Sequence, residues 1–180
     1  RAQVGLGHLS EGVARLQKAL ALFREANSPY DVVNLLQDLT FAYASQGRFD
    51  EAASYLGEAL PIARRLGSSA LLAGVLNNLG MLHYERGDYE QALSLHQEGL
   101  TVARRADDTR NQSHLADGMA RLYRDAGVYR VAESLYDVAW QIARMSRPEE
   151  AVEILASRAD LHRWQGDPAR ALALLEQGAR

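Results

Sequence analysis

The chain has 180 residues, of which 47% are hydrophobic and 24% are charged, and its net charge at pH 7 is −3. This composition can bury a continuous core and is unlike that of a disordered segment. The acidic balance disfavours direct nucleic-acid binding, which rests on clustered cations. The absence of cysteine excludes disulfides and fits a reducing compartment, so we expect a cytoplasmic protein. No apolar run approaches the roughly 20 residues that span a bilayer, and no membrane contact is expected.

An internal repeat runs along the chain and is marked by glycines at nearly equal intervals: Gly47, Gly87, Gly127 and Gly166. The segments around these glycines superimpose, and a partial copy at the start of the chain aligns on Gly7. Such a period is typical of stacked helical units that share one core. In chain order we expect a partial repeat over 1–27 and repeats over 28–67, 68–107, 108–147 and 148–180.

Each repeat has the pattern of a helical hairpin. Apolar side chains recur at spacings of three and four on both sides of each glycine, which predicts two amphipathic helices. The glycine should end the first helix in a left-handed conformation, and a helix ending before Gly7 is expected as well. Caps or helix-starting prolines stand where the next repeats begin: Ser28-Pro29, Gly67-Ser68, Asp107-Asp108 and Arg147-Pro148. We expect one leading helix and four hairpins, cut as a fragment from a longer protein.

The core is predicted by residues that recur in register with the glycines. A small residue follows each glycine by five positions, where helices can close to about 8–10 Å: Ala52, Ala92, Ala132 and Ala171.

His83, His96 and His162 occupy registers that hold Leu or Tyr in other repeats, so we expect all three in the core. At the chain ends the stripes of Val13, Leu16 and Leu20 and of Leu172 and Leu175 are expected to be partly exposed and so to favour end-to-end self-association.

These motifs resemble the tetratricopeptide repeat family. The resemblance is carried by the pair Leu79-Gly80, by the Gly-x-Tyr/Phe-x-x-Ala pattern and by a small residue twelve positions after each glycine, and it covers almost the whole chain. It implies an all-α fold, a right-handed α-solenoid of hairpins. Repeats of about 40 residues are similar to those of kinesin light chains, spindle-orientation scaffolds, bacterial peptide-pheromone receptors and the helical domains of maltose-activator-type bacterial regulators.

Residues that would support catalysis do not converge in the sequence. Gly5-Leu6-Gly7 matches neither phosphate-binding signature. Carboxylates such as Asp50 occupy first helical turns, where the helix dipole accounts for them. His114 and Asp117 share one helix face, but neither neighbouring turn supplies a third metal ligand. We therefore expect no enzyme activity, no cofactor and no metal.

The candidate binding residues lie on the face of the first helices that does not enter the core, the face that lines the concave groove in the resembled family. Amide side chains there can bond to an extended peptide backbone, and aromatic residues and methionine supply adaptable apolar contact. Packing against the neighbouring repeat is the alternative role. The candidates are Asn34, Gln37, Phe41, Asn77, Asn78, Met81, Tyr84, Asp117, Arg121, Arg124, Asp160, Arg163 and Trp164.

Two sets of arginines bear on the choice of partner. In the C-terminal half of the groove Arg121, Arg124 and Arg163 stand among aspartates, so either they hold an acidic partner segment or the charges pair with each other. A second set recurs near the ends of the second helices: Arg24, Arg64, Arg104 and Arg144. The helix dipole favours cations at these ends. The alternative is a basic ridge that binds an acidic partner or DNA.

The sequence thus favours a non-catalytic scaffold that binds a protein or peptide segment, as the sensor or interaction segment of a larger bacterial regulator. Three other functions stay open at this point. They are an intracellular scaffold or adaptor module, a self-assembly element, and an allosteric segment that binds a small effector.

Overall fold

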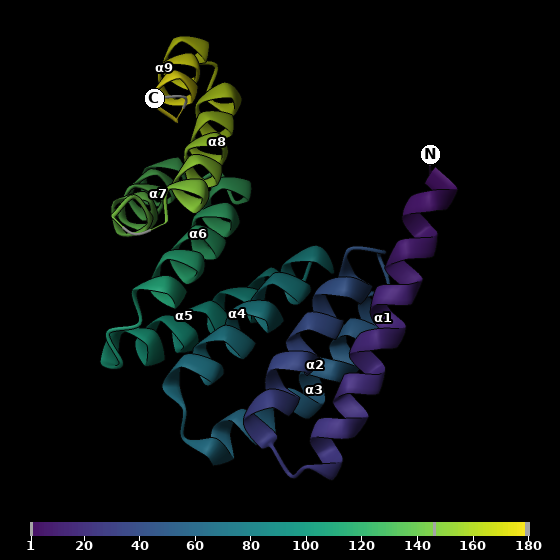
Figure 1. Ribbon diagram of the computed structural model, residues 1–180. Coiled ribbons are helices and arrows are strands. Elements are labelled where there is room, and N and C mark those ends of the chain that lie inside the picture. Colours follow the sequence, from purple (N-terminus) through teal and green to yellow (C-terminus); the bar gives the residue numbers. More distant parts are fainter. Residues whose placement is uncertain (1, 146, 179–180) are drawn as a thin grey trace.

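The computed structural model describes residues 2–145 and 147–178, which are helical apart from short turns and contain no strand. A leading helix is followed by four hairpins, as predicted (Figure 1). The helices are α1 (Ala2–Glu25), α2 (Pro29–Ala44), α3 (Phe49–Leu66), α4 (Ser69–Glu85), α5 (Tyr89–Arg105), α6 (Thr109–Asp125), α7 (Tyr129–Ala143), α8 (Pro148–Trp164) and α9 (Pro168–Gly178).

The turn inside each hairpin depends on the glycine that marks the repeat. These glycines have φ angles of +72°, +80°, +74° and +77°, in the left-handed region that a side chain disfavours. The first helix therefore ends at the predicted place in all four hairpins: before Gly47, Gly87, Gly127 and Gly166.

The turns between hairpins use caps and prolines. Ser68 accepts a hydrogen bond from the Leu71 backbone N–H, and Asp108 accepts one from that of Asn111. Pro29 and Pro148 lie in the first turns of α2 and α8, where their missing N–H groups cost nothing. The sequence signals for the start of each repeat are thus confirmed.

The helices form two layers, an inner layer of first helices (α2, α4, α6, α8) and an outer layer of second helices (α3, α5, α7, α9). Successive first helices contact one another at the backbone, whereas successive second helices do not within the described chain. A stack that is tighter on one side curves toward that side. The hairpins accordingly follow an arc from α1 to α9, and the inner face is concave (Figure 1).

The core lies between the layers and contains the predicted small residues, since Ala52, Ala92, Ala132 and Ala171 are all buried. His96 and His162 are buried as predicted, but His83 is only partly buried, so its assignment to the core is wrong. The His83 ring lies near the hairpin turn, where its Nδ1 is 3.3 Å from a carboxylate oxygen of Asp88. A polar partner at the edge of the hairpin replaces core packing there.

Helix α1 differs from expectation in two ways. It continues through Gly7 without a turn, because glycine permits a left-handed φ but does not require one. Its stripe packs against the core that α2 and α3 form: Leu20 is buried, whereas Val13 and Leu16 stay partly exposed, so the expected partial exposure is wrong only for Leu20. At the other end of the arc, Leu172 and Leu175 of α9 are 58% and 48% exposed, as expected.

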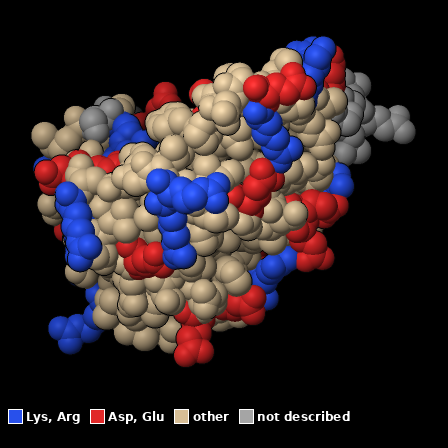
Figure 2. All heavy atoms as spheres, turned by 90° about the horizontal axis from the view of Figure 1, so that it is seen from below, with Lys and Arg blue, Asp and Glu red and all other residues tan. Residues whose placement is uncertain are grey.

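The surface carries both signs of charge. Figure 2 shows lysine and arginine side chains interspersed with aspartate and glutamate on the face seen from below. Within the described residues, no helix is both long enough and apolar enough to cross a bilayer.

Candidate functional site

The inner face contains a hollow of about 460 Å³ between α2, α4, α6 and α8. Its size is in the range of sites that hold a small molecule or several side chains of a peptide. All of its lining residues except one belong to first helices. We call this cavity the inner hollow. Its lining residues are Gln37, Phe41, Gly74, Asn77, Asn78, Met81, Tyr84, Glu85, His96, Arg110, Asn111, His114, Asp117, Gly118, Arg121, Glu150, Glu153 and Ile154.

Polar side chains fix the spacing of the helices on the α2 side of the hollow. The Asn78 amide donates to Gln37 Oε1 across 3.1 Å and so ties α4 to α2. Gly74 leaves room for this contact, since a Cβ there would lie 3.0 Å from Gln37 Oε1. Two of the candidate amides, Gln37 and Asn78, are therefore already partnered with each other within the fold.

The floor of the hollow is the imidazole of His96, the one lining residue from the outer layer. This ring passes from α5 between Gly80 of α4 and Gly118 of α6, and a Cβ on either glycine would lie 2.6 Å from its Cε1 atom. The side chain is 1% exposed, and its Nδ1 has no hydrogen-bond partner. Burial, assisted by the charge of Arg121, lowers the pKa of His96 to about 4, so the ring is neutral at pH 7.

Two acceptor atoms beside this floor lack donors. Asn77 is 8% exposed; its amide nitrogen lies 3.7 Å from the sulfur of Met81, but its Oδ1 atom has no partner. Asp117 forms an ion pair through Oδ2 with Arg121 Nε at 3.0 Å, and its Oδ1 atom is buried without a partner. Burial raises the pKa of Asp117, although the charge of Arg121 opposes that shift. Unpaired buried acceptors are costly, so the hollow favours a ligand that donates hydrogen bonds.

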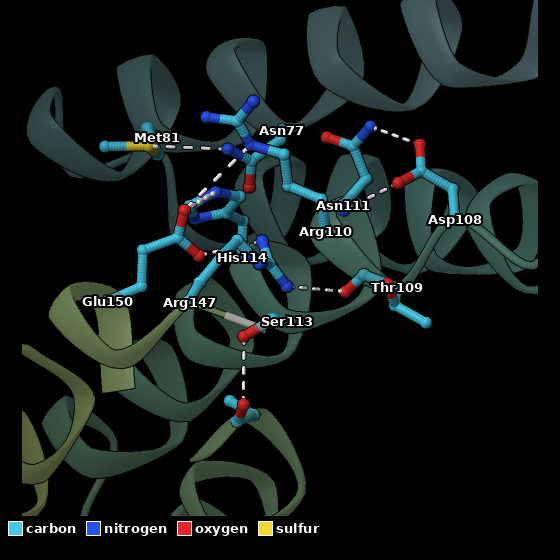
Figure 3. A network of polar contacts seen from close by, with 11 residues as sticks. Asn77, Met81, Asp108, Thr109, Arg110, Asn111, Ser113, His114, Arg147 and Glu150 are labelled. Carbon is cyan, nitrogen blue, oxygen red and sulfur yellow. Dashed lines mark hydrogen bonds and ion pairs between the residues drawn. The ribbon is translucent and has the colours of Figure 1, made fainter. Parts of the chain in front are cut away.

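A second cluster, centred on Glu150 of α8, closes the hollow on the α6 side (Figure 3). Arg147 approaches one carboxylate oxygen at 2.7 Å, while His114 Nε2 and Arg110 Nε lie 3.6 and 3.9 Å from the other. Burial lowers the pKa of His114, so its ring does not neutralise Glu150 at pH 7. Asp117 and Glu150 are thus near His114, yet no set of three potential metal ligands converges among the described residues.

The arginines that were expected to meet an acidic partner are paired within the chain. Besides the pair of Arg121 and Asp117, Arg124 Nε lies 2.8 Å from Asp125, and an Arg163 nitrogen lies 2.8 Å from Asp160. The structure therefore shows the alternative in which the charges pair with each other.

Tyr84 joins α4 to α6 beside these pairs. Its hydroxyl donates to Asp125 at 2.5 Å and accepts from Arg124 at 3.3 Å. Burial and the bond to Asp125 raise the pKa of Tyr84 to about 12. The Arg124 guanidinium also stands 5.0 Å from the centre of the Trp164 ring.

Eight of the thirteen candidate residues line the inner hollow: Gln37, Phe41, Asn77, Asn78, Met81, Tyr84, Asp117 and Arg121. The other five lie outside its lining: Asn34, Arg124, Asp160, Arg163 and Trp164. An apolar rim adjoins the hollow, where Phe41 is 77% and Met81 46% exposed beside Ala44 and Phe49.

Sequence reasoning missed the lining residues that come earlier in the first helices. Gly74, His114 and Glu153 occupy the register of Asn34, thirteen positions before their glycines, so extending that column would have found them. Arg110, Asn111 and Glu150 stand sixteen or seventeen positions before the glycines, a register that the groove pattern did not include.

Comparison with known proteins identifies the repeat. The family model described as tetratricopeptide repeat matches residues 5–65 and 71–145. No match was found among curated proteins. Among solved structures, BtubC of P. vanneervenii is similar with a TM-score of 0.77 at 20% identity, over 99% of this chain and 74% of that protein.

Two further solved structures share the fold at low identity. The tetratricopeptide-like repeats of a putative kinesin light chain from Podospora anserina give a TM-score of 0.67 at 18% identity, over 97% of this chain and 87% of that one. A signal transduction ATPase with a tetratricopeptide repeat sensor from Pyrococcus horikoshii gives 0.70 at 19% identity, over 95% of this chain and 27% of that one. With its family model matched over most of its length, the chain belongs to the tetratricopeptide repeat family.

Proposed function

We propose that the chain is a non-catalytic scaffold of the cytoplasm that binds a protein or peptide segment on its concave inner face. The observation that carries this proposal is the inner hollow together with its apolar rim. Unpaired buried acceptors lie next to exposed Phe41 and Met81 side chains, so one surface offers both hydrogen bonds and apolar contact. A peptide backbone with apolar side chains satisfies both.

The proposed setting is a larger bacterial regulator in which this segment senses or holds its partner. The ATPase from Pyrococcus horikoshii supports a sensing segment within a larger protein, since its repeats are described as a sensor and this chain covers only 27% of it. An adaptor role would use the same surface. A small effector could occupy the hollow alone, but it would leave the apolar rim uncovered, so we favour a peptide.

A peptide array tests the proposal. Acetylated and amidated heptapeptides of varied sequence are probed with the wild-type chain, and the best binders are measured by fluorescence polarisation. Met81→Ala should weaken binding, because Met81 lines both the hollow and the rim, and a loss of about 1 kcal/mol or more would place it among the few residues that dominate an interface. Met145→Ala is the matched control, since Met145 is 78% exposed and does not line the hollow.

Two results would refute the proposal. One is an array without binders, and the other is a set of binders that Met81→Ala and Met145→Ala affect equally.

A further inference from the structure

The inner hollow has the charge balance of a site for a cation. Four carboxylates line it, from Glu85, Asp117, Glu150 and Glu153, against the two guanidinium groups of Arg110 and Arg121. The nearby histidines do not change this balance at pH 7, because burial lowers the pKa values of His96 and His114. Arg147 partners Glu150 but is outside the lining, so the hollow keeps a surplus of negative charge.

The unpaired atoms near the floor are acceptors for the same kind of group. Asp117 Oδ1 and Asn77 Oδ1 are buried without partners, and both residues line the hollow. Asp117 can accept another bond while its second oxygen remains with Arg121. A guanidinium presents several N–H donors in one plane and is less strongly hydrated than an ammonium, which suits a partly buried pair of acceptors.

We propose that the inner hollow takes a basic side chain of the bound segment, foremost an arginine, whose N–H groups donate to Asp117 Oδ1 and Asn77 Oδ1. This rests on the proposed function, because it names the chemistry of the peptide that the inner face binds. The rim formed by Phe41, Met81 and Phe49 then receives an apolar side chain near that arginine. The partner is a segment that combines a basic and an apolar residue, in place of the acidic segment that the sequence favoured.

The existing arginines of the groove support a basic partner. Arg121, Arg124 and Arg163 are each within 3.0 Å of an aspartate oxygen, so an aspartate already offsets each of these charges, and an acidic ligand would add a second carboxylate beside it. A basic ligand supplies donors for the two buried oxygens that lack them. The observations therefore distinguish the two partner chemistries in favour of the cation.

The test uses the same array with a charge readout, followed by paired measurements in solution. Binders should be enriched in arginine or lysine near leucine, methionine or an aromatic residue. For the best arginine-bearing peptide, a version with citrulline in place of arginine keeps the shape and removes the charge. It should bind the wild-type chain about tenfold or more weakly, as expected for loss of a charge-assisted hydrogen bond.

Asp117→Asn should weaken binding of the arginine peptide by a similar factor. It should also abolish the difference in affinity between the arginine and citrulline peptides. Asp160→Asn is the control for loss of an aspartate–arginine pair within one helix, because Asp160 pairs with Arg163 at an exposed position outside the hollow. The comparison of arginine with citrulline uses the unaltered chain and so does not depend on the folding of any variant.

Each other outcome has a separate meaning. Two results would overturn the cation site while peptide binding stands. One is a set of binders that are acidic or indifferent to charge. The other is a difference in affinity between the arginine and citrulline peptides that Asp117→Asn leaves unchanged. An array without any binder would overturn the proposed function itself.

Discussion

The two glycines that enclose His96 allow a direct test of the packing between α4, α5 and α6. In Gly80→Ala the new Cβ would lie 2.6 Å from His96 Cε1, whereas carbon atoms in contact stay about 3.5–4.0 Å apart. The ring cannot move away easily, because Gly118 encloses it at the same distance on the α6 side. Overpacking of this kind costs about 1–3 kcal/mol of unfolding free energy.

The same substitution also raises helix propensity by about 1 kcal/mol, so a control is needed to separate the two effects. Gly57→Ala supplies it, since Gly57 lies inside α3 and a Cβ there would meet nothing within 4 Å. We expect Gly57→Ala to stabilise the chain by about 1 kcal/mol. Gly80→Ala should be less stable than Gly57→Ala by about 1–3 kcal/mol, which is the cost of the clash.

Urea unfolding followed by circular dichroism measures both variants, and unchanged slopes would show that only stability has changed. Repeating Gly80→Ala in a His96→Ala background removes the ring, and there the glycine substitution should stabilise as it does at position 57. Equal gains from Gly80→Ala and Gly57→Ala in the wild-type background would refute the packing described for His96.

Three further predictions concern the core, the buried imidazole and the exposed end. Ala132→Leu should lower the unfolding free energy by about 1–3 kcal/mol through overpacking, whereas the exposed Gln97→Leu should change it by less than about 0.5 kcal/mol, as thermal or urea melts will show. Burial lowers the pKa of His96 from 6.5 to about 4, so as the pH falls the unfolded chain binds a proton at this residue before the folded chain does. The contribution of His96 to the free energy of unfolding is therefore full above pH 6.5 and is lost as the pH falls from 6.5 to 4. His96→Gln should flatten that loss in urea midpoints taken across this range, and identical pH profiles would contradict the assignment. Leu172→Glu with Leu175→Glu should shift any concentration-dependent oligomer to monomer in light scattering, and an oligomer unaffected by the pair would exclude this end as its interface.

The period of the repeat was sufficient to predict the hairpins, because each marked glycine has to adopt a left-handed φ for the chain to reverse. The same reasoning failed at Gly7, where the glycine keeps a helical conformation and α1 continues. Register predicted the burial of His96 and His162 but not the position of His83, whose neighbour Asp88 offers an ion pair at the hairpin edge.

The candidate site was predictable only in part, because it depends on contacts between repeats. A single column of residues indicates which side faces inward, and eight of the thirteen candidates do line the hollow. Whether a charged side chain is paired depends on the distances between side chains, which a column of residues does not give. The ion pair of Arg124 with Asp125 is an example. The place of His96 as the floor depends on Gly80 of α4 and Gly118 of α6, which belong to different repeats and do not share one register position.

The gaps in backbone contact along the outer layer leave the contact between successive second helices to side chains. Exposed ion pairs bridge these gaps at two places, where Arg24 meets Glu58 at 2.7 Å and Arg64 meets Glu98 at 3.1 Å. The matching position opposite Arg104 is Val138, so the bridge is not repeated between α5 and α7. Such exposed pairs weaken as salt rises. Rising ionic strength should therefore weaken the contact of α1 with α3 and of α3 with α5, and the rim at Phe41 and Met81 belongs to α2 and α4, which pack beside these helices.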